Sequence, residues 1–311
     1  MINKIQIAIW TVALMGSALL YGADSNRHKE DFRYTFTLVN GRIDLTGFNG
    51  SIEIIGGDTN TVEVTGSKYA SEQANLSKVQ VDAVQEGNTV RIRATKPKEG
   101  SGWNCNCGAK FTIRAPRRTE LTMIRSSNGG IRVENIEAPV NLGTSNGPIK
   151  LMQVKGRVEA KTSNGGVDLQ SIEGSVMVTT SNGQVTIDNV RGGLRVNTSN
   201  GGIRGRIIDT VGNEPVQVST SNGGIDLRID ASHNNDITAT TSNGGVTLRM
   251  PESANARISA STSSHESVMT DLPLQVRGTL TKNRLDGTIG NGSGPQIRVE
   301  TSNGSIKILK L

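Results

Sequence analysis

Residues 161–169, KTSNGGVDL, carry side chains that could take part in catalysis. The hydroxyl of Thr162, the amide of Asn164 and the carboxylate of Asp168 lie within this one short segment, as in many catalytic loops. The Ser-Asn-Gly triplet in the segment, however, occurs eight times in the chain. An active site is normally unique, whereas a recurring triplet is typical of a structural repeat. The repetition therefore predicts that the triplet forms a corner of the fold.

The triplets recur with a fixed period. The four intervals between their first five asparagines are all 18 residues. The repeated asparagines are Asn128, Asn146, Asn164, Asn182, Asn200, Asn222, Asn243 and Asn303. With Asn counted as position 1, positions 4 and 6 are apolar in nearly every unit, as are positions 13 and 15, which is the alternation of strands with one buried face. Each unit is therefore predicted to hold two short strands and two turns, with a bend near positions 7 and 8.

Two architectures fit this order of strands and turns. An Asn-Gly pair between alternating strands is typical of a β-hairpin, which would give an antiparallel meander. That meander would need roughly sixteen strands in one open sheet, more than the usual limit of about ten. In a parallel β-solenoid each unit is one coil, and equivalent side chains stack about 4.8 Å apart. Because stacking explains why the corners share one sequence, we expect an all-β, right-handed parallel β-solenoid with coils of about 18 residues.

The corners and turns have further predicted properties. The threonine before most triplets shares the parity of the buried positions, so its methyl group should face the core and its hydroxyl should bond along the stack. Asparagine and glycine tolerate a positive φ, which we expect at each corner. Units five to seven carry three or four extra residues, all in the second turn, so that turn is the edge that tolerates insertions.

The chain divides into three predicted regions. Residues 1–23 are typical of a secretory signal peptide, with an uncleaved membrane anchor as the alternative. Residues 24–126 form an irregular N-terminal β region with a first coil at residues 40–57, in which Asn40 takes position 1. Residues 127–311 form the regular solenoid with TSNG corners. We therefore expect an exported protein of the periplasm, the outer surface or the medium, with no integral membrane span after signal cleavage.

Composition and motifs argue against several function classes. The net charge is only +6, with basic residues spread along the chain and 3% aromatic residues, so no nucleic-acid partner is expected. Asp168 and Asp226 lie at the outward position 5 rather than in a corner, which argues against a calcium-binding nonapeptide repeat. The chain has no paired-acid constellation and no G-x-S-x-G motif, so we predict a protein that is not an enzyme and needs no cofactor or metal. Inward threonines argue against an ice-binding array.

One outward column could bind anions. Arg206, Arg228 and Arg249 occupy position 7 of consecutive coils, with Arg204 beside them. Guanidinium groups stacked about 5 Å apart repel one another unless an anion or a carboxylate offsets their charge. The carboxylates that could neutralise the column are those of Asp209, Asp226 and Asp230. The sharper hypothesis is that the four arginines form a docking strip for anionic glycan or phosphate groups.

Two cysteines, Cys105 and Cys107, lie in the segment GSGWNCNCGAK, which is predicted to be an exposed loop. An even cysteine count in an exported protein indicates a disulfide, which here would close a small, strained ring. Metal binding and intermolecular pairing are the alternatives, although two ligands alone make a weak metal signal.

The signal peptide, the segment NGRIDLTGFNGSIEIIGG and the run of TSNGG(I/V)xL units resemble a bacterial family of β-strand-repeat proteins of unknown function, the putative adhesins, which are related to adhesin head domains. The resemblance covers roughly residues 34–311 and implies an exported β-solenoid, without catalytic residues to carry over. The leading hypothesis is an exported, non-enzymatic envelope scaffold that binds a polymer such as an anionic envelope glycan, a membrane surface or a surface protein. The alternative is a carbohydrate-active β-helix enzyme, a polysaccharide lyase or hydrolase. The oligomeric state stays open.

Overall fold

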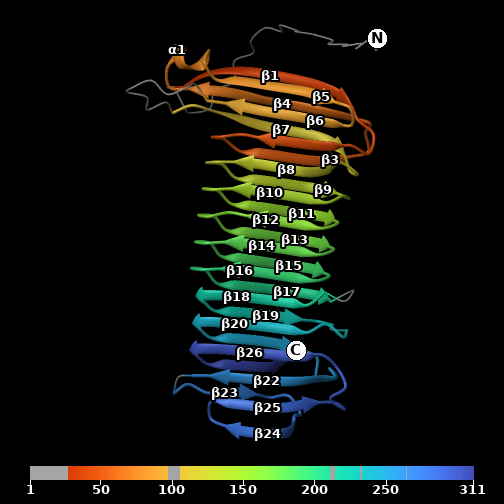
Figure 1. Ribbon diagram of the computed structural model, residues 1–311, viewed down its shortest axis with the longest axis vertical. Coiled ribbons are helices and arrows are strands. Elements are labelled where there is room, and N and C mark those ends of the chain that lie inside the picture. The colour runs from red at the N-terminus through yellow and green to blue at the C-terminus, as the bar shows by residue number, and fades with distance from the viewer. Residues whose placement is uncertain (1–26, 97–105, 211–213, 232, 264) are drawn as a thin grey trace, which may run out of the picture.

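The computed structural model describes residues 27–96, 106–210, 214–231, 233–263 and 265–311. These residues form an elongated stack of coils in which two β-sheets face each other (Figure 1). A short helix, α1 (Gln73–Leu76), lies near the N-terminal end of the stack. The predicted signal peptide and Cys105 lie outside the described residues. No helix in the described part is long and apolar enough to cross a membrane.

Each regular coil gives one strand to each sheet. Sheet A of this region consists of β9 (Ile131–Ile136), β11 (Ile149–Lys155), β13 (Val167–Glu173), β15 (Val185–Arg191), β17 (Ile203–Asp209), β19 (Ile225–Ile229) and β21 (Val246–Met250). Sheet B consists of β10 (Val140–Thr144), β12 (Val158–Lys161), β14 (Val176–Thr180), β16 (Leu194–Thr198), β18 (Val216–Asn222) and β20 (Ile237–Asn243). Neighbouring strands of these coils are parallel, so the meander is excluded and the predicted parallel β-solenoid is confirmed.

The register of the strands follows the sequence period. In sheet A, Val167 pairs with Ile149 on one side and with Val185 on the other. In sheet B, Val176 pairs with Val158 in the same manner. Equivalent positions of successive coils therefore lie directly over one another, as the 18-residue spacing predicted.

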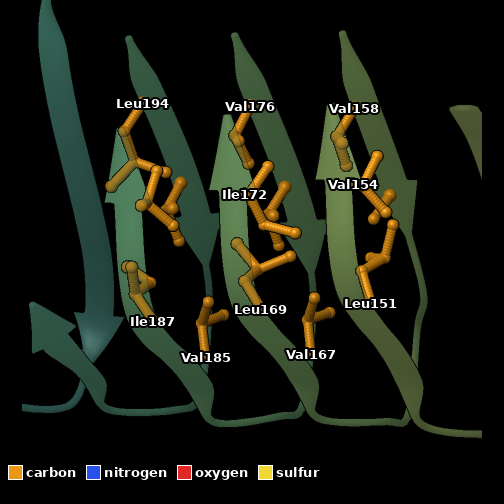
Figure 2. Close-up of a cluster of buried hydrophobic side chains, with 14 of the residues drawn as sticks. Leu151, Val154, Val158, Val167, Leu169, Ile172, Val176, Val185, Ile187 and Leu194 are labelled. Carbon is orange, nitrogen blue, oxygen red and sulfur yellow. The ribbon is translucent and has the colours of Figure 1, made fainter. Parts of the chain in front are cut away.

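The core fills the space between the two sheets. Figure 2 shows Val167, Leu169 and Ile172 of one coil together with Val176, and their counterparts occupy the same places in the neighbouring coils. These four side chains are at most 2% exposed. Burial of an aliphatic side chain stabilises a fold by about 1.5–3 kcal/mol. The alternating apolar residues therefore hold the two sheets together along the length of the stack.

The bend near position 8 is confirmed, and it uses a left-handed backbone. Four non-glycine residues there have φ between 53° and 57°, namely Asn135, Gln153, Ser171 and Asn189. The expectation of a positive φ at the Ser-Asn-Gly corners is wrong, because neither residue of any of the eight Asn-Gly pairs has one. The corners need glycine for a different reason, which is the close approach of successive coils.

The N-terminal coil is inserted into the stack instead of lying at its end. Strands β2 (Arg42–Thr46) and β3 (Ile52–Gly57) lie between β8 (Glu120–Ser126) and β9 on one side and β6 (Thr89–Thr95) and β7 (Gly108–Pro116) on the other. Antiparallel strands β1 (His28–Thr37), β4 (Thr61–Ala70) and β5 (Gln80–Glu86) extend the sheets beyond it (Figure 1). The irregular N-terminal strands therefore cover this end of the solenoid.

The register predicted for this first coil is wrong. Strand β2 pairs with β8 in sheet B, and β3 pairs with β9 in sheet A. Position 1 is therefore Asn49, which bridges to Asn128, and not Asn40. The two strands of a coil have the same alternation of apolar residues, so the pattern alone does not tell one half of the coil from the other.

The C-terminal end has the same kind of topology. Strands β26 (Gln296–Asn303) and β27 (Ile306–Lys310), the last in the sequence, lie between β20–β21 and the strands β22 (Ala256–Thr262) and β23 (Val268–Thr270). Strands β25 (Arg284–Ile289) and β24 (Gln275–Thr281) continue sheet B with antiparallel pairing. At the C-terminal end the chain covers the stack with β22–β25 and then returns to form the inner coil β26–β27, whereas at the N-terminal end the inner coil β2–β3 comes before the covering strands β4–β7. Both arrangements limit the parallel edge left open for further pairing.

Candidate functional site

The Ser-Asn-Gly corners stack along one edge of the solenoid. The Nδ2 of each corner asparagine donates a hydrogen bond of 2.6–2.9 Å to the Oδ1 of the asparagine in the neighbouring coil. This asparagine ladder runs through Asn49, Asn128, Asn146, Asn164, Asn182, Asn200, Asn222, Asn243 and Asn303. Asn303 stacks on Asn243, 60 residues earlier, because β26 and β27 are inserted at this point. Each inner amide donates and accepts, so the bonds polarise one another.

The first member sets the direction of the ladder. Asn49 Nδ2 donates a hydrogen bond of 2.9 Å to the backbone carbonyl of Cys107. A carbonyl oxygen can only accept, so Asn49 must turn its NH2 group toward Cys107 and its Oδ1 toward Asn128. Asn49 is missing from the sequence-based set because no serine precedes it. Its Asn-Gly pair with apolar residues at positions 4 and 6 was the signal that could have identified it.

A second set of hydrogen bonds lies beside the asparagine ladder. Thr162 Oγ1 donates to the carbonyl of Gly147 at 3.0 Å, and the backbone N–H of Asn164 donates to Ser145 at 2.8 Å. The equivalent threonines form the same hydroxyl bond to the neighbouring corner glycine in the other coils, and they are 2–7% exposed. The predicted inward direction of the threonines is therefore confirmed. Their hydroxyls satisfy corner carbonyls that would otherwise be buried without a partner.

The first glycine of each corner allows this close stacking. A Cβ added to Gly165 would lie 2.5 Å from the carbonyl carbon of Gly147 and still closer to its oxygen. The corners of Gly129, Gly183 and Gly201 are equally crowded. A side chain at this position would therefore clash with the backbone of the neighbouring coil, whatever its rotamer.

The chemistry of KTSNGGVDL is thus used within the stack. Each coil adds three hydrogen bonds at the corner, one from the asparagine side chain, one from the threonine hydroxyl and one from a backbone N–H. Each of these hydrogen bonds contributes about 1 kcal/mol to stability. Asp168 faces outward from β13, and its carboxylate lies 3.6 Å from Lys150 Nζ. These groups do not converge on a common point where a substrate could react.

The arginine column forms as the repeat indicated. Arg228 pairs in register with Arg206 on one side and with Arg249 on the other, on the outer face of sheet A. Carboxylates occupy much of the column. Arg206 Nε and Arg228 Nε each donate a 2.6 Å hydrogen bond to Asp230, and Arg249 forms an ion pair with Asp226.

The electrostatics of the column follow from these contacts. Burial raises the pKa of Asp230, but hydrogen bonds from Arg206 and Arg228 outweigh it, so the net pKa lies below the ordinary value of an aspartate. Asp209 was the third carboxylate that could neutralise the arginine column, but its Oδ1 lies 2.9 Å from His233 Nδ1 instead. Arg204 is exposed and lies opposite Asp226 in the register.

Cys107 is 2% exposed, so the expectation of an exposed loop is wrong for this residue. It packs with Ala70, Leu76 and Val79, and partly buried Phe48 covers this small cluster. Because Cys105 lies outside the described residues, its pairing with Cys107 stays a prediction.

The remaining polar features of the described part are modest. No group of three or more His, Cys, Asp or Glu residues in it could hold a metal ion. A groove with a volume of about 310 Å³ lies on sheet A, lined in part by Gly57, Thr61, Glu63 and Arg114. Glu63 lies opposite Arg114 in the register and forms an ion pair with Arg33, so the groove offers little uncompensated charge.

Comparison with known proteins identifies the family of the chain. No curated protein matches it. Among solved structures it is similar to a putative adhesin from Parabacteroides merdae (11% identity, 92% of this chain and 97% of that chain, TM-score 0.37) and to one from Bacteroides fragilis (13%, 91% and 97%, TM-score 0.32). It is also similar to a putative lipid binding protein from Parabacteroides distasonis (14%, 93% and 98%, TM-score 0.37). The matching family model, Toastrack DUF4097, covers residues 40–309, and the chain therefore belongs to that family.

Proposed function

We propose that the protein is an exported, non-enzymatic scaffold of the cell envelope that binds a linear anionic polymer along the arginine column of sheet A. The observation that carries this proposal is the in-register row of Arg206, Arg228 and Arg249 on a rigid face. A parallel stack holds such groups at intervals of about 4.8 Å. A sugar unit in an extended glycan advances by a similar distance, so successive anionic units can meet successive coils.

The charge balance of this face supports an anionic ligand. Between β15 and β27, the outward rows at positions 5 and 7 hold five cations, Arg204, Arg206, Arg228, Arg249 and Lys307. Asp188 and Asp226 lie in the same rows, and Asp230 adds a third carboxylate. Two positive charges are left in excess, and Arg204 is exposed. A polymer that contacts several coils at once gains affinity from multivalency, even where each contact is weak.

The same contacts favour binding over catalysis. Asp230 is held by Arg206 and Arg228, and Asp226 is held by Arg249. A glycosidase or lyase acting on this face would need a carboxylate or a base placed at the bond that breaks. Here the carboxylates fix the guanidinium groups in a row, which suits recognition of repeated anions.

The test is salt elution from immobilised polygalacturonate, with neutral dextran as the reference matrix. We expect the mature protein to bind the anionic matrix and to elute at higher salt than the variant R204A/R206A/R228A/R249A. The matched control is R93A/R125A/K161A/R195A, which removes the same charge from exposed residues of sheet B. Equal losses in the two variants, or no loss in the first, would contradict the proposal. The single change Arg204→Glu disturbs no ion pair seen in the structure, so it tests the strip even if the fourfold variant folds poorly.

Export and the absence of turnover need separate measurements. Fractionation of cells, combined with mass spectrometry of the mature N-terminus, should find the protein outside the cytoplasm with a segment close to residues 1–23 removed. Polygalacturonate incubated with the protein should keep its chain length. Depolymerisation that is lost on changing one outward carboxylate would favour the enzyme hypothesis instead.

A further inference from the structure

The chain contains eleven Asn-Gly pairs, a dipeptide that is chemically unstable in flexible peptides. The backbone nitrogen of glycine attacks the asparagine Cγ, a C–N bond forms, and ammonia leaves as a succinimide ring closes. Water then opens the ring on either side and yields aspartate or isoaspartate. Each event replaces a neutral amide by a carboxylate, and isoaspartate also lengthens the backbone.

Nine of the eleven pairs belong to the asparagine ladder. Asn182 is typical, since its Nδ2 donates to Asn164 and its Oδ1 accepts from Asn200, both at 2.8 Å. For ring closure the amide must rotate toward the following nitrogen, so both ladder bonds have to open. The glycine nitrogens are held as well in several coils, because Gly223 N and Gly244 N each donate a 3.0 Å bond to an asparagine carbonyl of the neighbouring corner.

The other two pairs, Asn40-Gly41 and Asn291-Gly292, lie outside the ladder. Asn40 is exposed, and its side-chain amide forms no hydrogen bond with the described residues. The Oδ1 of Asn291 accepts from the backbone and the hydroxyl of Ser293, but its Nδ2 donates to none of the residues that the structure covers. Both bonds come from Ser293, two residues along the chain, and end on Oδ1, so no described residue holds the Nδ2 that leaves as ammonia, whereas the ladder holds both polar atoms of each inner amide.

We propose that Asn40 and Asn291 are the sites of spontaneous deamidation in this protein, and that the amide ladder protects the nine other Asn-Gly pairs. The protection matters for the fold. A carboxylate at position 182 would have no N–H to donate and would turn an oxygen toward the Oδ1 of Asn164. The same repeat that provides the corners therefore also shields the amides that hold them together. This inference does not depend on the proposed ligand.

The experiment is peptide mapping of the full mature chain after incubation at mildly alkaline pH and 37 °C, with the mass gain measured at each Asn-Gly pair. We expect inner ladder sites to convert about 30-fold more slowly than Asn40, because two hydrogen bonds, each worth about a fivefold change in rate, must open first. In urea the eleven sites should convert at similar rates. Conversion of inner ladder sites as fast as Asn40 in the folded protein would overturn the inference.

A variant separates the ladder from the general rigidity of the corner. Asn182→Ala removes one hydrogen bond from each neighbour, so Asn164 and Asn200 should deamidate about fivefold faster while Asn222 stays unchanged. The control is Thr179→Ala, an exposed position on β14, three residues before Asn182, with no side-chain hydrogen bond to the described residues. If the rates at Asn164 and Asn200 are the same in both variants, the ladder does not protect them and the proposal fails.

Discussion

Replacing Gly165 with alanine should strongly destabilise the solenoid, although the change adds only one methyl group. The new Cβ would lie 2.5 Å from the carbonyl carbon of Gly147 and 3.0 Å from Thr162 Oγ1. The backbone of Gly147 cannot withdraw without opening the corner stack. Overpacking costs about 1–3 kcal/mol where side chains can adjust. Because this clash is with backbone, we expect a loss of about 3 kcal/mol.

The matched control is Gly143→Ala on β10. The nearest heavy atom to a Cβ there is Arg125 Cγ at 3.7 Å, which is ordinary contact, and φ is not positive. Alanine restricts the unfolded chain more than glycine does, so this variant should be as stable as the wild type or gain up to about 1 kcal/mol. Both variants add one methyl group, but only the methyl group at position 165 would meet the backbone of the neighbouring coil.

Thermal unfolding followed by circular dichroism measures both variants. At about 2–4 °C per kcal/mol for a chain of this order of size, Gly165→Ala should lower the Tm by about 6–12 °C. Hydrogen exchange should show the loss first in the amides of the corners next to Gly165, because each coil contacts only its neighbours. A Tm for Gly165→Ala equal to that of Gly143→Ala would refute the crowding argument for the corner glycines.

Three further predictions concern the turns, the threonines and the ion pairs. Gln153→Gly should raise the free energy of unfolding in urea by about 1 kcal/mol, because φ is 53° at Gln153 and glycine adopts this angle freely. A lower free energy of unfolding would contradict the claim that Gln153 is strained. Thr180→Val should lose about 1–3 kcal/mol in the same assay and Thr180→Ser much less, because the hydroxyl bonds the Gly165 carbonyl at 3.0 Å. The pKa of Asp230 is lowered in the folded protein, so its contribution to stability is complete at pH values above its unfolded-state pKa of about 3.9 and is lost as the pH falls through its folded-state pKa. Asp230→Asn should therefore weaken the pH dependence of stability below about pH 4.

The amount that could be predicted differs between the middle and the ends of the chain. In the middle, Val167 and Val185 are separated by one period and pair in the structure, because one period of sequence equals one coil. The contact of Arg206 with Asp230 follows less directly, since Asp209 and Asp226 both lie nearer to Arg206 in the sequence. Which carboxylate reaches a guanidinium depends on side-chain geometry across strands, and the repeat pattern does not contain it.

The sequence by itself determined the period, the inward positions, the inward threonines and the stacking of like asparagines. Each of these depends on contacts between a residue and its equivalent in the next coil, so a regular repeat is sufficient to predict them. Only the tertiary structure decided that Asn49 joins the ladder, that Asn303 stacks on Asn243, and that both terminal coils lie inside the stack. The irregular end segments compete to cover the open sheet edges, and the outcome depends on long-range pairing and burial that no local pattern records.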